Sequence, residues 1–259
     1  MGSIDQNTSM LDVTGQKVRV YEAGEGLPVV VLHGWGGRIE SMAPVLTCLE
    51  RDHRVISMDL PGFGESPVPA DVWGTPEYAG FVRATLAHIG IERADFVGHS
   101  YGAKTSLYLA ATTSVVDRLV LQGSSGLRTP PSMSARLKRM LSRAARAVGK
   151  LGPPGRSIRQ AIYDRIASQD YKDAGALRPI LVKVVNEDLS DLCPKVASST
   201  LLVWGRGDTA SPIKHAERFE KLIPDAGLVV FEGAGHFAYL DDPQRFCTIV
   251  SHFLKRESA

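Results

Sequence analysis

Apolar positions along the chain form short runs that end in glycine-containing loops. Residues 17–22 alternate between polar and apolar side chains, as a half-exposed strand does. Residues 27–32 are instead continuously apolar, which is typical of a strand buried on both faces. Further strands are predicted from short apolar runs at 54–58, 94–97, 116–121, 200–204 and 227–231.

Stretches of helix length lie between these runs. The predicted helices span 77–89, 103–111, 213–222 and 243–254. Because strands alternate with helices, the pattern predicts an α/β fold with a mainly parallel sheet. The glycine-rich loops follow the strands, and ligands of such sheets bind at the carboxyl ends of the strands.

The alternation stops after Gly126, where the sequence favours helices and has few β-branched runs. It resumes with the run at 200–204. We therefore predict an α/β core made of residues 1–127 and 191–259, with residues 128–190 inserted as a helical cap, or lid.

The overall charge narrows the classes of partner. A formal net charge of +2 over 259 residues, without an aromatic and basic recognition motif, argues against nucleic-acid binding. No signal pattern opens the sequence and no apolar run reaches membrane-spanning length, so we expect a cytoplasmic protein without membrane insertion.

The cysteines are three in number and far apart in the sequence. Cys48, Cys193 and Cys247 have neither Cys-x-x-Cys nor metal-ligand spacing. This argues against a disulfide framework and against a zinc site, and it predicts free thiols in a reducing compartment.

Residues 98–102 (GHSYG) place a serine between two glycines, directly after the strand at 94–97 and before an alanine-rich helix. A nucleophile elbow requires this strand–turn–helix context. Glycine at both flanks allows the strand and the helix to approach closely around the turn. We predict that Ser100 is a catalytic nucleophile, the alternative being a serine in an ordinary tight turn.

A serine hydroxyl needs a base within hydrogen-bond reach and a carboxylate that orients the base. His236 follows the strand at 227–231 and Asp208 follows the strand at 200–204, so both lie at the sheet edge predicted for Ser100. The chain order Ser, Asp, His is the order expected for this arrangement. Asp59 also follows a strand, and we interpret it as a turn-stabilising carboxylate.

Acyl transfer builds negative charge on a carbonyl oxygen, which backbone amides stabilise in an oxyanion hole. The amides of Tyr101 and Trp35 are the candidates, because one follows the nucleophile and the other lies in the loop after a buried strand. Residues 33–37 (HGWGG) are not followed by the Lys-Ser/Thr of a phosphate-binding loop, and no dinucleotide fingerprint is present. We interpret His33 and His99 as residues that orient loops by hydrogen bonding.

Five motifs together resemble the α/β-hydrolase superfamily, in its esterase and lipase-like branch with a cap. They are residues 33–37 (HGWGG), 59–66 (DLPGFGES), 98–102 (GHSYG), 205–208 (GRGD) and 233–236 (GAGH). The resemblance implies an eight-stranded, mostly parallel sheet flanked by helices, a helical cap after the sixth strand, and no cofactor. Haloalkane dehalogenases and epoxide hydrolases of this superfamily carry Asp where Ser100 stands, whereas carbon–carbon bond hydrolases and cofactor-free perhydrolases keep the serine.

Tyr101 and Lys104, which both follow Ser100, depart from the usual family pattern. Tyr101 is bulkier than the Met or Leu often found there, so we expect it to narrow the acyl or alcohol side of the site. Lys104 is unusual on a buried nucleophile helix, and we expect its amine to reach outward.

The predicted cap is basic. Arginines at 136, 139, 143 and 146 are spaced three or four apart and would form one stripe on a helix. One interpretation is a solvated helix face, and the other is a contact with an anionic substrate or an acidic carrier protein. An esterase that acts on a carrier-protein-bound methyl ester is similar to this chain at residues 33–36.

We therefore predict a serine hydrolase that cleaves a small to medium ester or thioester through an acyl-enzyme on Ser100. The same three residues permit carbon–carbon bond hydrolysis of a diketone-like substrate, or acyl transfer. A receptor that binds a small ligand with little turnover is the alternative from a different functional class.

Overall fold

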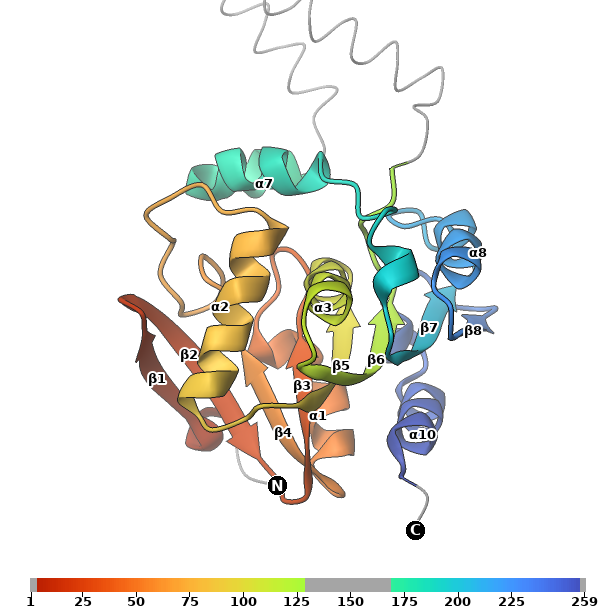
Figure 1. Cartoon of the computed structure of the whole chain (residues 1–259), viewed down its shortest axis with the longest axis horizontal. Helices are drawn as coiled ribbons and strands as arrows, with labels where there is room; N and C mark the ends of the chain where they lie inside the picture. Colours follow the sequence, from red (N-terminus) through yellow and green to blue (C-terminus); the bar gives the residue numbers. More distant parts are fainter. Residues whose placement is uncertain (1–3, 129–168, 257–259) are drawn as a thin grey trace, which may run out of the picture. The chain divides into compact units, whose positions relative to one another are not determined.

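The computed structural model describes residues 4–128 and 169–256 (Figure 1). The chain divides into two compact units, one made of Met1–Leu127 and Lys183–Ala259 and the other of Arg128–Val182. Most of the predicted cap, 128–190, lies outside the described residues. The cap and its boundaries therefore stay a prediction.

The first unit contains an eight-stranded sheet with the order β1-β2-β4-β3-β5-β6-β7-β8 (Figure 1). β1 pairs antiparallel with β2, and β2 with β4, whereas all the other neighbours are parallel. The predicted eight-stranded, mostly parallel sheet is thereby confirmed. The strands are β1 (Thr8–Val13), β2 (Gln16–Ala23), β3 (Leu27–Leu32), β4 (His53–Met58), β5 (Ala94–His99), β6 (Val116–Gln122), β7 (Ser199–Gly205) and β8 (Ala226–Phe231).

Helices flank this sheet, and those predicted from the sequence begin and end within a few residues of the observed bounds. The described α-helices are α1 (Ala43–Leu49), α2 (Thr75–His88), α3 (Tyr101–Thr112), α6 (Gln169–Asp173), α7 (Arg178–Val185), α8 (Ile213–Leu222), α9 (Ala238–Asp241) and α10 (Pro243–Leu254). Short 3₁₀ helices are η1 (Ile4–Asn7), η2 (Ile39–Met42), η3 (Gly175–Leu177) and η4 (Cys193–Lys195). Among the described helices, none is both long and apolar enough to cross a membrane.

The continuous apolar run of β3 reflects its place in the middle of the sheet. Val30 pairs with Ile56 of β4 on one side and with Phe96 of β5 on the other. Successive side chains of a strand point to opposite faces, and helices cover both faces of a parallel sheet. A strand in this position therefore requires apolar residues at consecutive positions.

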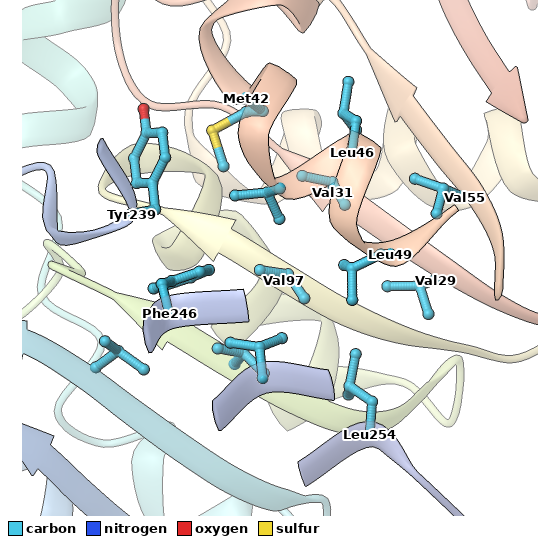
Figure 2. Packing of buried hydrophobic residues seen from close by; sticks show 14 of the residues in the cluster. Val29, Val31, Met42, Leu46, Leu49, Val55, Val97, Tyr239, Phe246 and Leu254 are labelled. Carbon is cyan, nitrogen blue, oxygen red and sulfur yellow. The ribbon is translucent and has the colours of Figure 1, made fainter. Parts of the chain in front are cut away.

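One face of the sheet is covered by α1 and α10 (Figure 2). Leu46 of α1 and Phe246 of α10 are each 1% exposed, and they belong to the same cluster as Val31 and Val97 of the central strands. Burial of each such side chain contributes about 1.5–3 kcal/mol. This packing holds the strands in register and so fixes where the loops at their carboxyl ends emerge.

Candidate active site

Ser100 lies in the sharp turn between β5 and α3. Its φ is 51°, in the left-handed region that a residue with a side chain rarely adopts. The backbone N–H of Ser100 donates a hydrogen bond of 2.9 Å to the carbonyl of Gln122, the last residue of β6. A conformation of this kind costs about 1–3 kcal/mol and persists only where the surroundings impose it.

The two glycines around Ser100 are required by close backbone packing. A Cβ on Gly102 would lie 2.4 Å from the carbonyl oxygen of Leu32, at the end of β3. A Cβ on Gly98 would lie 2.5 Å from the backbone of Ala103. Glycine at both positions thus allows α3 to begin directly against the ends of β3 and β5.

The loop after β3, residues 33–37, passes beside Ser100. A Cβ on Gly34 would lie 3.1 Å from Ser100 Cβ. The amides of Trp35 and Tyr101 donate no hydrogen bond to any other described residue, and the Trp35 and Tyr101 rings meet edge to face at 5.8 Å. The structure therefore brings both predicted oxyanion-hole residues next to the Ser100 turn.

His33 holds this loop in place. Its Nδ1 lies 2.7 Å from the Gly34 carbonyl, and its Nε2 accepts a 3.0 Å hydrogen bond from the Leu60 amide. With Nδ1–H as donor and Nε2 as acceptor, the ring is neutral. Burial lowers the pKa of His33 below its ordinary value, which favours this neutral form. The predicted loop-orienting role of His33 is thus supported by its hydrogen bonds.

Asp208 and His236 meet at the carboxyl ends of β7 and β8. His236 Nδ1 lies 2.7 Å from Asp208 Oδ2, and the Asp208 side chain is fully buried. The other carboxylate oxygen, Oδ1, accepts hydrogen bonds of 2.8 Å from the Ala210 amide and 2.7 Å from the Ser211 amide. The carboxylate is therefore fixed in orientation before it contacts the imidazole.

Gln122 joins the Ser100 turn to His236. Its carbonyl accepts a hydrogen bond from the Ser100 amide. Its side-chain Nε2 donates a hydrogen bond of 2.9 Å to the His236 carbonyl. His99 Nε2 lies 3.2 Å from the same carbonyl, and burial lowers the pKa of His99 to about 3, so the ring is neutral. Sequence analysis did not identify Gln122, whose only signal is its position at the end of a strand.

Gly123, which follows Gln122 in the chain, lies beside the Asp208–His236 pair. A Cβ there would be 3.1 Å from His236 Nδ1 and 3.3 Å from Asp208 Oδ2. Its φ of 54° is in the region that favours glycine. The end of β6 therefore touches both the serine turn and the histidine–carboxylate pair, which lie on opposite sides of it in the sheet.

Asp59, the competing carboxylate, has other partners. Its Oδ1 accepts a hydrogen bond of 2.8 Å from the Ile39 amide, and its Oδ2 accepts one of 2.9 Å from the Glu65 amide. The buried guanidinium of Arg19 lies 3.6 Å from Oδ2. These contacts agree with the interpretation of Asp59 as a loop-stabilising carboxylate.

The expectation that the Lys104 amine reaches outward is wrong. Lys104 is 2% exposed. Its Nζ donates to the Val184 carbonyl at 2.5 Å and lies 3.2 Å from Glu187 Oε2. Lys104 is buried by a tertiary contact, because the segment after residue 182 passes over this face of α3. Burial lowers the pKa of Lys104, and the nearby carboxylate of Glu187 opposes that shift.

Glu187 also fixes the start of α2. Its Oε1 accepts a hydrogen bond of 3.0 Å from the Thr75 amide, and its Oε2 accepts one of 2.5 Å from the Thr75 hydroxyl. Lys104, Glu187 and Thr75 therefore tie the segment after residue 182 to both α2 and the helix that follows Ser100. The arginines of the predicted basic stripe lie outside the described residues.

Comparisons with known proteins agree on one family. The sequence pattern described as "Alpha/beta hydrolase family" matches residues 29–249. The chain is 30% identical to 2-hydroxy-6-oxo-6-(2'-aminophenyl)hexa-2,4-dienoic acid hydrolase of Metapseudomonas resinovorans, covering 94% of this chain and 89% of that protein. It is 27% identical to 2-hydroxymuconate semialdehyde hydrolase of Pseudomonas putida, covering 95% and 93%. Among solved structures, an esterase from Exiguobacterium antarcticum is similar with a TM-score of 0.75 and 25% identity, over 96% of this chain and 99% of that one.

We expect Lys104→Met to lower the free energy of unfolding by about 3 kcal/mol, because it leaves the Glu187 carboxylate without its buried cation. Lys183→Met is the matched control. Lys183 pairs with Glu77 at 3.2 Å, but the two side chains are 41% and 44% exposed, so the loss should stay below about 1 kcal/mol. Urea unfolding measures both variants, and equal losses would contradict the structural role of Lys104.

Proposed function

Since this chain belongs to the α/β-hydrolase family, we propose that it is a serine hydrolase that cleaves a small to medium ester or thioester through an acyl-enzyme on Ser100. The observation that carries the proposal is that the Ser100 turn and the Asp208–His236 pair lie at one sheet edge, on either side of the end of β6. The Asp208–His236 hydrogen bond of 2.7 Å and the Ser100 turn are both attached to Gln122. Such an arrangement suits nucleophilic catalysis by a serine.

In the proposed first step, Ser100 Oγ attacks the carbonyl carbon of the substrate while His236 Nε2 takes the hydroxyl proton. Nδ1–H of the same ring donates to Asp208, which holds the imidazole in the required tautomer and stabilises the imidazolium that forms. Because two backbone amides already orient the Asp208 carboxylate, little reorganisation accompanies the proton transfer.

The attack converts the carbonyl oxygen into an oxyanion. The Trp35 and Tyr101 amides, which have no other partner among the described residues, are the donors we assign to this oxygen. Loss of one such donor in comparable sites costs about 3–4 kcal/mol of transition-state stabilisation. The strained turn at Ser100 and the glycine at position 34 supply the close approach that this role requires.

The intermediate then collapses. The bond to the leaving alcohol or thiol breaks, and His236 returns its proton to the departing oxygen or sulfur. A water molecule attacks the acyl-enzyme while His236 takes one of its protons, and the carboxylic acid and the Ser100 hydroxyl are released. The reaction as proposed needs no cofactor.

The surroundings of the reacting groups support an apolar substrate. The Phe237 ring is 46% exposed and lies 5.3 Å from the ring of His236. The ring of Tyr101 is almost fully buried between Trp35 and Tyr78. The phenyl ring beside the base offers apolar area that an uncharged acyl or alcohol group could cover. An acidic carrier protein as the bearer of the acyl group stays a prediction.

Carbon–carbon bond hydrolysis is the second candidate, and the relatives favour it. The dienoic acid and semialdehyde hydrolases named above are 30% and 27% identical to this chain over nearly its whole length. In such a reaction a ketone carbonyl carbon is attacked, and the electron pair of the broken bond leaves on carbon, which takes a proton. The same histidine and oxyanion donors would serve both reactions.

We expect Ser100→Ala to reduce turnover of p-nitrophenyl esters by on the order of 10⁶-fold, because no other group supplies the nucleophile. Ser199→Ala, at an exposed position of β7, is the control and should keep full activity. Release of p-nitrophenolate measures both. Unchanged turnover in Ser100→Ala would refute the assignment, and an unaltered chain that turns over neither esters nor dienoates would favour a receptor.

Asp208→Asn should lower kcat/KM by on the order of 10⁴-fold, since an amide at this position favours the wrong tautomer of His236. Asp59→Asn serves as the comparison. It weakens contacts with the Ile39 and Glu65 amides, so it should lower the melting temperature with a far smaller kinetic effect. If Asp59→Asn caused the larger loss of kcat/KM in a folded protein, Asp208 would not be the orienting carboxylate.

A direct comparison of substrate classes separates the two candidate reactions. We expect kcat/KM for a p-nitrophenyl ester of a short acyl chain to exceed kcat/KM for a 2-hydroxy-6-oxo-dienoate. Loss of the dienoate absorbance measures the second reaction. Ser100→Ala should abolish the favoured reaction. A higher kcat/KM for the dienoate would establish the carbon–carbon reaction as the function.

A further inference from the structure

Cys48 and Cys247 are far apart in the sequence, but they lie on the two helices that cover one face of the sheet. α1 carries Cys48 and α10 carries Cys247. Leu49 of α1 and Leu254 of α10 belong to the same buried cluster (Figure 2). The two thiols therefore sit at a packed contact between helices.

The contacts around the two sulfurs fix their placement. Cys48 Sγ lies 3.7 Å from the Ser251 hydroxyl, and Cys247 Sγ lies 3.8 Å from the Pro44 carbonyl. Pro44 and Cys48 are one helical turn apart, as are Cys247 and Ser251, so each pair forms a row on its helix. The two rows face each other across the contact between α1 and α10, so the two thiols are neighbours.

This contact makes the two thiols chemically unequal. The neighbouring Cys247 thiol and the Ser251 hydroxyl stabilise a thiolate on Cys48 and lower the pKa of Cys48. The proximity of Cys48 raises the pKa of Cys247. Both residues are partly exposed. Reactivity of a cysteine requires thiolate character and access, so Cys48 has both properties and a second thiol within reach.

Cys193 provides an internal contrast. It is buried, and its thiol donates to the Leu189 carbonyl at 3.4 Å. Burial raises the pKa of Cys193 to about 11. A thiol in such surroundings is inert toward oxidants.

We propose that Cys48 and Cys247 form a redox modification site, at which a peroxide converts the two thiols into a disulfide that joins α1 to α10. The proposal rests on the packing of these helices and is independent of the proposed hydrolase function.

The reaction proceeds in two steps. The Cys48 thiolate attacks one peroxide oxygen, the O–O bond breaks, and the departing hydroxide takes a proton to become water, which leaves a sulfenic acid on Cys48. Cys247 sulfur then attacks the sulfenic sulfur, the S–O bond breaks, and water leaves with the thiol proton. Two thiols are oxidised and one hydrogen peroxide is reduced to two water molecules.

The test is peptide mapping of the full chain after treatment with a small excess of hydrogen peroxide under native conditions. Free thiols are then alkylated in denaturant before digestion. We expect two of the three thiols to be lost, a peptide in which Cys48 is linked to Cys247, and an unmodified Cys193. A reductant should restore all three thiols. Three intact thiols, a link through Cys193, or a link only between chains would overturn the proposal.

Two variants separate the steps. Cys247→Ser should stop the reaction at the sulfenic acid, so a dimedone probe should label Cys48 and no intramolecular disulfide should form. Cys193→Ser is the matched control and should form the disulfide as the unaltered chain does. Absence of dimedone labelling on Cys48 in folded Cys247→Ser would contradict the first step. If Cys247→Ser does not fold, the peptide mapping of the unaltered chain still tests the proposal.

Discussion

At Ser100 the chain turns from β5 into α3 with a φ of 51°, a conformation that costs about 1–3 kcal/mol and that the neighbouring backbone has to impose. The Ser100 amide is held by the Gln122 carbonyl, and α3 is pressed against the ends of β3 and β5 at glycines 98 and 102. Any side chain at these glycines would overlap the backbone. The conformation of the serine turn thus depends on the packing of the central strands.

The end of β6 is the second element on which the site depends. β6 lies between β5, which leads to Ser100, and β7, which leads to Asp208. Gln122 reaches the Ser100 amide with its carbonyl and the His236 carbonyl with its side chain. Gly123 leaves room for the histidine ring and the carboxylate. Parallel strands end at one edge, so a single strand end can position groups that are more than a hundred residues apart in the chain.

The sequence was most informative where local packing dictates residue type. Strands buried on both faces must be continuously apolar, so β3 to β7 were predicted nearly to their observed bounds. β1, Thr8–Val13, was missed because an edge strand that is largely exposed has no such pattern. α1, Ala43–Leu49, was missed because a helix of two turns gives little periodic signal.

Groups whose surroundings come from distant segments could not be predicted. Lys104 is buried only because residues 184–187 pass over α3 and supply a carbonyl and a carboxylate. Gln122 acts through contacts on both sides of a strand end. Cys48 and Cys247 become neighbours only when α1 packs on α10. In each case the residue type alone has many uses, and tertiary contacts decide among them.

The central claim is that Ser100 is a nucleophile activated by His236 in the folded chain. Its most direct test is intact-mass analysis after incubation with a fluorophosphonate, followed by peptide mapping of the adduct. The account predicts one adduct per chain, located on Ser100, that does not form when the chain is unfolded in urea. A folded chain that stays unlabelled, or that carries the adduct on another serine, would contradict the account.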